Sequence, residues 1–348
     1  MTGENAMKNL TIIVTLFAAL GMQPRIASAA PPEPLKLVQT ISMPQVKGRI
    51  DHLGIDIYRG RLFIAGLGNN TVEVVNFKAG KWAESIPGYQ TPQGIWYVPS
   101  VDKVFAASAD DGTCRVLRAS DLKQIDSIKL AADVNRLIYN PVAHELYAGY
   151  GGKAAGWDYG EIAAINPRTD QVTGKIKVAS HPAEILVNES GRKLFVAIFP
   201  ASKIQVIDIP KRTVITTWST GDAHVGDMAL DEATHRLFAG SSHPPVLLIY
   251  DSESGKQIAS MPIVAGMDGV WFDAKLKRIY ISGGRKLPSG FVEVIQEKDA
   301  DHYQSIARVP TGPGAGTSLF VPELNRLYVV VPAHGQTNAE VMAFEPQP

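Results

Sequence analysis

Side chains that can bind a ligand or a metal ion recur in short segments along the sequence. In most of these segments, histidine, carboxylate, amide or guanidinium groups stand directly before an apolar stretch. Polar groups of these kinds commonly line a small-molecule site when a fold brings them to one concave surface. The candidate binding residues are Arg49, Asp51, His52, Gln93, Asp133, Asn135, Arg136, His181, Glu184, His224, Asp227, Asp268 and Thr317.

A divalent cation is one ligand that this set could hold. Carboxylate and carbonyl oxygens suit Ca²⁺ or Mg²⁺, whereas imidazole together with carboxylate suits Zn²⁺. The candidate metal ligands are Asn135, Glu184, Asp227 and Asp268. They come from different segments, so no ligand spacing marks them as a metal motif, and each Asp or Asn could instead cap its own tight turn. The sequence leaves both interpretations open.

The common catalytic motifs are missing from the sequence. It contains no H-E-x-x-H zinc motif, no C-x-x-C pair and no G-x-S-x-G nucleophile turn. No residue can therefore be assigned a catalytic role, and the sequence favours binding over catalysis.

An aromatic residue, here called the repeat aromatic, marks a repeating unit. Each repeat aromatic lies in a short apolar run, and successive residue numbers differ by 42, 42, 48, 43, 42 and 48. Repeats of about 40–45 residues with four strands each are typical of β-propeller blades. The repeat aromatics are Phe63, Phe105, Tyr147, Phe195, Phe238, Tyr280 and Tyr328.

The stretch 224–263 shows one complete repeat. Its four apolar runs are Met228–Leu230, Arg236–Gly240, Val246–Tyr250 and Gln257–Ile263, separated by Asp, Ser, Gly and Pro. A single four-stranded sheet cannot bury both of its faces, so neighbouring repeats must cover them. The sequence therefore predicts an all-β, seven-bladed β-propeller of four-stranded antiparallel blades that spans residues 30–348. The expected blades are 49–88, 89–130, 131–178, 179–220, 221–263, 264–310 and 311–348.

The last repeat has only three strand-like runs, which end with Ala339–Phe344. The run Leu35–Met43, before the first repeat, alternates like a strand and has no partner in its own repeat. We therefore expect this N-terminal strand to close the ring, because pairing it with the last repeat removes an exposed sheet edge.

The first strand of each blade lines the central channel of a propeller, so the polar segments that lead into it should open on one face. We expect the candidate binding residues to form a ring at one mouth of the channel. The two longest repeats carry glycine-rich insertions, at 149–160 and 283–290, which should form loops.

The composition excludes some functions. The chain has 34 Lys and Arg and 34 Asp and Glu, so its formal net charge of zero gives no electrostatic basis for binding nucleic acid. Its single cysteine, Cys114, cannot form an internal disulfide and is expected to be a small buried side chain. We also expect the mature protein to be a monomer.

The N-terminus resembles a secretory signal. An apolar run at 10–22 follows Lys8, and Ala27-Ser28-Ala29 matches a cleavage site. We therefore expect residues 1–29 to be a signal peptide, the mature chain to be periplasmic or secreted, and no membrane insertion after cleavage. A retained membrane anchor is the alternative.

Three short motifs carry a resemblance to a known family. Thr91-Pro92-Gln93-Gly94 before a first strand, Leu-aromatic-Val/Ile-Ala in the second strand, and the segment 68–75 (GNNTVEVV) resemble the YVTN repeats of YncE-like propellers. These are exported bacterial seven-bladed proteins, and the resemblance covers residues 30–348. It implies the fold rather than an activity, because this fold hosts many functions.

The leading hypothesis is an exported, soluble propeller that binds a small molecule or a periplasmic protein through the polar mouth of its channel. One alternative is a metal-dependent, lactonase-like hydrolase with a divalent cation in the mouth. The other alternative is an accessory protein of a periplasmic quinoprotein or redox system. Both alternatives rest on analogy with proteins of similar fold.

Overall fold

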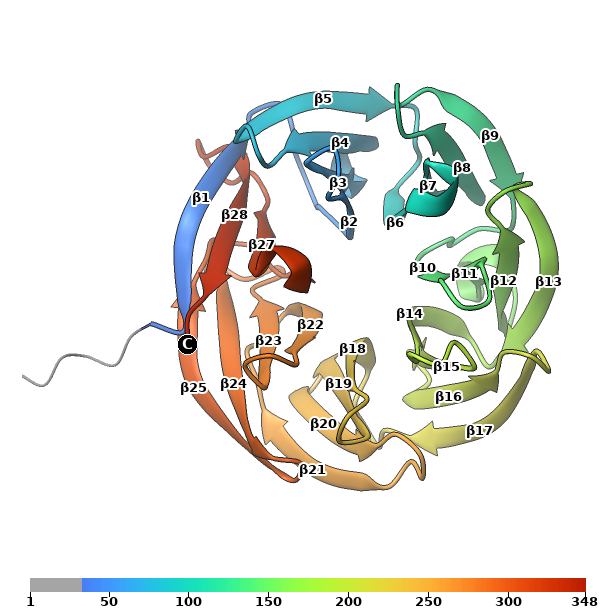
Figure 1. Cartoon of the computed structure of the whole chain (residues 1–348), viewed down its shortest axis with the longest axis vertical. Helices are drawn as coiled ribbons and strands as arrows, with labels where there is room; N and C mark the ends of the chain where they lie inside the picture. Colours follow the sequence, from blue (N-terminus) through green and yellow to red (C-terminus); the bar gives the residue numbers. More distant parts are fainter. Residues whose placement is uncertain (1–32) are drawn as a thin grey trace, which may run out of the picture. The chain divides into compact units, whose positions relative to one another are not determined.

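The computed structural model describes residues 33–348, which form seven four-stranded antiparallel sheets arranged as the blades of a β-propeller (Figure 1). This confirms the predicted fold. The expected signal peptide, residues 1–29, lies outside the described residues. Within residues 33–348, no helix has both the length and the apolar character needed to span a bilayer.

The strands of blades one to six follow one another along the chain. Blades one to three contain β2 (Leu53–Asp56), β3 (Arg61–Gly66), β4 (Thr71–Asn76), β5 (Lys81–Pro87), β6 (Pro92–Val98), β7 (Lys103–Ser108), β8 (Thr113–Arg118), β9 (Gln124–Lys129), β10 (Leu137–Asn140), β11 (Glu145–Gly151), β12 (Gly160–Asn166) and β13 (Gln171–Val178). Blades four to six contain β14 (His181–Val187), β15 (Lys193–Phe199), β16 (Lys203–Asp208), β17 (Thr213–Ser219), β18 (Val225–Asp231), β19 (Arg236–Ser242), β20 (Pro245–Asp251), β21 (Gln257–Pro262), β22 (Met267–Asp273), β23 (Arg278–Gly283), β24 (Phe291–Asp299) and β25 (His302–Pro310). Short 3₁₀ helices are η1 (Leu67–Asn69), η2 (Pro99–Val101), η3 (Lys153–Ala155) and η4 (Pro322–Leu324).

Blade seven combines the two ends of the described chain. It contains β26 (Ser318–Val321), β27 (Arg326–Val331), β28 (Ala339–Pro346) and, as its outermost strand, β1 (Leu35–Met43). β1 runs antiparallel to β28, with Met43 opposite Ala339. The predicted closure by the N-terminal strand is confirmed, and it leaves β28 without a free edge.

The core lies between successive blades. All seven repeat aromatics are buried, as the repeat pattern requires. Phe238 of blade five shows the contact: its ring centroid lies 5.3 Å from that of Phe272 and 5.6 Å from that of Tyr303, both in blade six. The core is therefore divided among the inter-blade interfaces, which is how residues 33–348 can form seven blades without a single large core.

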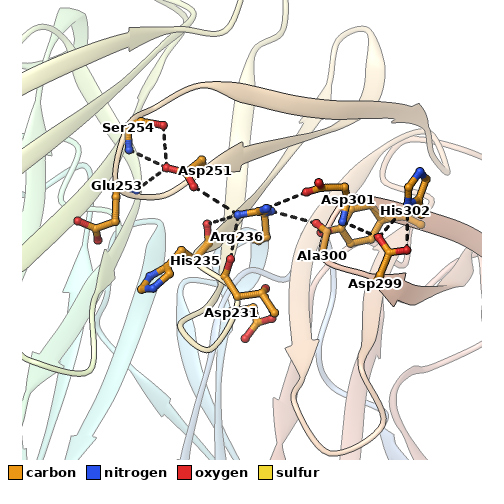
Figure 2. Close-up of polar contacts among 12 residues, drawn as sticks. Asp231, His235, Arg236, Asp251, Glu253, Ser254, Asp299, Ala300, Asp301 and His302 are labelled. Carbon is orange, nitrogen blue, oxygen red and sulfur yellow. Dashed lines mark hydrogen bonds and ion pairs between the residues drawn. The ribbon is translucent and has the colours of Figure 1, made fainter.

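Ion pairs connect successive blades on the face that carries the turns between first and second strands and between third and fourth strands. Figure 2 shows the contact between blades five and six, in which Arg236 reaches from β19 to the β24–β25 turn. Its guanidinium donates to Asp301 at 2.7 Å and to the carbonyl of Ala300 at 3.0 Å. It also lies 3.4 Å from Asp251 of its own blade.

The position of Arg236, two residues before a repeat aromatic, has the same role in other blades. The residue at this position bonds to the third-to-fourth-strand turn or the chain end of the next blade. Arg61 donates to the carbonyl of Ala119, Lys103 to Asp170, Lys193 to Glu253 and Arg278 to the carbonyl of Gln347. Blade three has the opposite charge here: Glu145 accepts from Arg212 of blade four at 2.9 Å. The inter-blade contact is thus kept with its polarity reversed.

We expect the Glu145–Arg212 pair to tolerate exchange of its two residues better than loss of one. Glu145→Arg alone places two guanidinium groups together and should lower the free energy of unfolding by about 1 kcal/mol. The double variant Glu145→Arg, Arg212→Glu should recover more than half of that loss. Urea unfolding of the three proteins measures both values. Equal losses in the single and double variants would show that the contact has no electrostatic component.

Candidate site at the mouth of the channel

A cavity of about 660 Å³ opens on the face opposite to the inter-blade ion pairs. Its walls come from the starts of the innermost strands of blades one to six and from loops that join second strands to third strands. Figure 1 shows these innermost strands, from β2 round to β22, facing the centre of the ring. The candidate binding residues that line the cavity are Arg49, Asp51, His52, Gln93, Asp133, Asn135, His181 and Asp268.

β-Bulges at the starts of three innermost strands decide which side chains face the cavity. The pairing of β14 with β15 shifts register between Pro182 and Glu184, and equivalent shifts occur in β18 and β22. A bulge leaves one residue unpaired and redirects its side chain. The unpaired residues are Ala183, Gly226 and Asp268, and all three line the cavity.

His181 lies between two polar residues of blade three. Its Nε2 is 3.1 Å from Nδ2 of Asn135, and its Nδ1 is 2.8 Å from a carboxylate oxygen of Asp133. The second contact is close but not aligned as a hydrogen bond, so Nδ1 of His181 has no hydrogen-bond partner among the described residues. The Oδ1 atom of Asn135 also has none.

Arginines neutralise the acidic residues on the blade-one and blade-six side of the cavity. Arg49 donates to Asp51 at 2.9 Å and lies 3.8 Å from Asp268. Arg285, in the loop after β23, binds the other oxygen of Asp268 at 3.1 Å. Thr317 of blade seven lies outside the lining, and its hydroxyl donates to Asp268 at 3.3 Å.

Arg136 lies below the cavity and connects blades on different sides of the channel. Arg136 does not line the cavity. It donates a hydrogen bond of 2.7 Å to Nδ1 of His52, which is a lining residue. Its Nε donates to Glu184 of blade four at 2.8 Å. Because His52 belongs to blade one, this one side chain extends across the channel beneath the cavity floor.

The contact with Arg136 fixes the form of His52. A guanidinium can only donate hydrogen bonds, so Nδ1 of His52 must accept and the proton of the neutral ring must sit on Nε2. Burial lowers the pKa of His52 well below its usual value, and the positive charge of Arg136 acts in the same direction. At neutral pH, His52 therefore presents an N–H donor, and Asp51 lies 3.5 Å from that nitrogen.

Glu184 and Asp227 form a buried carboxyl pair beside Arg136. Asp227 accepts hydrogen bonds from the backbone N–H groups of Met228 and Val270, at 2.8 and 3.1 Å, which favours its charged form. Burial raises the pKa of Glu184 well above its usual value, and the neighbouring charge of Asp227 raises it further, although Arg136 opposes both effects. Burial raises the pKa of Asp227 as well, but the hydrogen bond with Glu184 lowers it, so the protonated form is favoured at Glu184 rather than at Asp227.

The described residues, 33–348, contain no group of three or more His, Cys, Asp or Glu side chains placed to hold a metal ion. The carboxylates among the candidate metal ligands have other partners. Glu184 binds Arg136, Asp227 accepts from the backbone, and Asp268 binds Arg285. The fourth candidate, Asn135, contacts His181. Arginines thus bind two of the four candidate metal ligands, Glu184 and Asp268.

His224 lies outside the cavity lining. Its ring makes an edge contact with Phe199, with centroids 5.5 Å apart. His224 therefore supports the apolar part of the cavity wall rather than presenting a polar group to it.

Sequence reasoning missed the residues that the loops after second strands contribute to the cavity. These loops follow β15, β19 and β23. The second glycine-rich insertion, 283–290, was a usable signal, because an enlarged loop in a repeat often carries function. The missed lining residues from these loops and the strand ends beside them are Phe199, Ser242, His243, Pro245, Arg285, Lys286 and Leu287.

We expect acid to destabilise the fold through His52. The unfolded chain protonates this ring below about pH 6.5, whereas the folded chain does not until lower pH, so its contribution to stability is present above pH 6.5 and falls on acidification. In His52→Asn, the amide oxygen can still accept from Arg136 but cannot titrate. The loss of unfolding free energy between pH 7.5 and 5.0 should be smaller in this variant, by at most about 2 kcal/mol, the limit set by protonation of the unfolded ring alone. Urea unfolding at both pH values tests this, and equal losses in both proteins would contradict it.

No protein-family description matches this chain, and no curated protein does either. Among solved structures, hydrazine synthase from Kuenenia stuttgartiensis is similar, with a TM-score of 0.68 and 15% sequence identity over 83% of this chain and 93% of that chain. The similarity shows a shared β-propeller fold. At this identity it shows the fold alone, and membership of the YncE-like family stays a prediction.

Proposed function

We propose that this chain is a binding module that takes a small polar molecule into the cavity at the channel mouth. The observation that carries the proposal is a set of polar atoms in lining residues that are buried and have no hydrogen-bond partner among the described residues. They are Nε of Arg49 and Oδ1 of Asn135.

The energetics support a ligand that fits these atoms. A buried donor or acceptor without a partner costs about 1–3 kcal/mol, and the set contains both a donor, Nε of Arg49, and an acceptor, Oδ1 of Asn135. A molecule carrying hydrogen-bond donors and acceptors would remove this cost on binding. The cavity volume of about 660 Å³ falls in the range of about 300–1,000 Å³ that small-molecule sites occupy.

Filling the cavity tests this function. Gly226 lines the cavity, and a Cβ atom added to it would meet no heavy atom within 4 Å. Gly226→Trp should therefore occupy the mouth without disturbing the fold. Val142→Trp is the control, because Val142 is an exposed residue in the turn after β10, on the opposite face.

The measurement is ligand-detected NMR with a library of small polar molecules. We expect a subset of the library to bind the wild-type protein and Val142→Trp, and to lose binding in Gly226→Trp. If every molecule that binds does so equally to all three proteins, the mouth is not the binding site and the proposal fails.

We also propose that the protein is exported, as the sequence of residues 1–29 indicates. Fractionation of a bacterial host that expresses the full chain should place the processed protein outside the cytoplasm. The lactonase-like alternative has less support, because arginines bind two of the carboxylates that it requires as metal ligands. The redox-accessory alternative gains no support from a structural similarity that extends only to the fold.

A further inference from the structure

The lining of the cavity is divided into two sectors of different chemistry. Every apolar lining residue in the described part of the chain comes from blades four to six. These residues are Ala183, Phe199, Pro245, Ala265, Met267 and Leu287. Phe199 and Leu287 are the large apolar side chains among them that are exposed, with 38% and 39% of their surfaces accessible. Large apolar side chains that remain exposed in a concavity are available to cover an apolar part of a ligand.

Blades one to three contribute only polar side chains to the lining. Gln93, Asn135 and His52 belong to this sector, together with the ion pair of Arg49 and Asp51. In Figure 1, β2, β6 and β10 lie on one side of the channel, and β14, β18 and β22 lie on the other. The six apolar residues, here called the apolar sector, therefore face the polar sector of blades one to three across the cavity. They share their side of the lining with six polar residues, His181, Ser242, His243, Asp268, Arg285 and Lys286.

The charges of the lining cancel. Two of the acidic residues, Asp51 and Asp268, are already bound by arginines at 2.9 and 3.1 Å. With equal numbers of positive and negative side chains, the lining offers no net attraction to a charged ligand, whereas an uncharged group needs only hydrogen bonds. The cationic lining residues are Arg49, Arg285 and Lys286, and the anionic ones are Asp51, Asp133 and Asp268.

We infer that the ligand is an uncharged amphiphile, with a hydroxyl- or amide-bearing head and an apolar ring or chain. The head lies against blades one to three, where the side chains of Gln93, Asn135 and His52 supply hydrogen-bonding groups. The apolar part lies against Phe199 and Leu287. This inference rests on the proposed function and adds the chemical class of the ligand.

Three matched probes test the class. Phenyl β-D-glucoside has an uncharged hydroxylated head and an apolar ring, methyl β-D-glucoside has the head without the ring, and phenyl phosphate has the ring with an anionic head. Calorimetric titration should show phenyl β-D-glucoside binding about tenfold more tightly than methyl β-D-glucoside, because the apolar sector covers the ring. It should also bind more tightly than phenyl phosphate.

A double variant locates the apolar sector. Phe199→Ser with Leu287→Ser should reduce the advantage of the phenyl ring to about twofold or less, while the affinity for methyl β-D-glucoside stays unchanged. Retained binding of methyl β-D-glucoside also shows that the double variant is folded.

The outcomes separate this inference from the proposed function. Equal affinity for the two glucosides, tighter binding of phenyl phosphate, or no binding of any probe would overturn the amphiphile class. None of these results alters the Gly226→Trp experiment, which alone decides whether the mouth binds small molecules. The inference would also be overturned if the double variant still bound phenyl β-D-glucoside about tenfold more tightly than methyl β-D-glucoside. The phenyl group would then lie elsewhere than against Phe199 and Leu287.

Discussion

A chain that begins at residue 45 should fail to form a stable monomer, in contrast to one that begins at residue 33. The shorter chain lacks β1 and therefore exposes the whole outer edge of β28. It also loses three buried side chains, Leu35, Ile41 and Met43. At about 1.5–3 kcal/mol for each buried side chain, the expected loss is about 5–9 kcal/mol, comparable to the total stability of many domains. Size-exclusion chromatography with light scattering should detect oligomers or aggregates.

A control on the same strand separates strand pairing from general changes at the N-terminus. Leu37 and Val38 lie in β1 but are 46% and 41% exposed. Leu37→Lys with Val38→Lys should keep the strand paired and the protein monomeric. A monomeric shorter chain with the melting temperature of the longer one would show that β1 does not stabilise the ring.

Arg136→Met should lower the free energy of unfolding by about 3–5 kcal/mol, the usual cost of removing one partner of a buried ion pair. Arg136 is the donor to both Glu184 and His52, and its charge offsets that of Asp227. Without it, the carboxylate of Asp227 remains buried with no cation beside it. Urea unfolding at pH 7 measures the loss.

Glu184→Gln is the matched control for Arg136→Met. Because the raised pKa of Glu184 favours its protonated form, an amide should reproduce its shape, accept from Arg136 and donate to Asp227. We therefore expect a loss below about 1 kcal/mol, as for replacement of a hydrogen-bonded group by an isostere. A loss as large as that of Arg136→Met would mean that Glu184 is ionised, and the assignment of the proton would be wrong.

The sequence by itself determined the fold and the approximate position of the site. Residues in equivalent positions of a rotational repeat must form a ring, so the repeat aromatics located the inter-blade core and the polar segments located one end of the channel. The spare run Leu35–Met43 likewise identified the closing strand, because a three-stranded last repeat leaves an edge that needs a partner.

Only the tertiary structure decided which polar residues face the cavity. The side chains of a strand alternate between two faces, and one inserted residue reverses the alternation beyond it. The bulges in blades four to six therefore direct Ala183 and Gly226 into the cavity, while Glu184 and Asp227 lie outside its lining. The sequence periodicity does not reveal a bulge. The sequence therefore predicted where these four residues lie along the channel, but not which of their side chains face the cavity.

The contacts across the channel also depended on the tertiary structure. Arg136 meets His52 of blade one, 84 positions away in the chain, because the ring brings distant blades to one axis. The repeat pattern relates each blade to its neighbours and gives no information on which side chains are long enough to cross the channel. The opposition of the apolar and polar sectors has the same origin, since the ring places blades four to six opposite blades one to three.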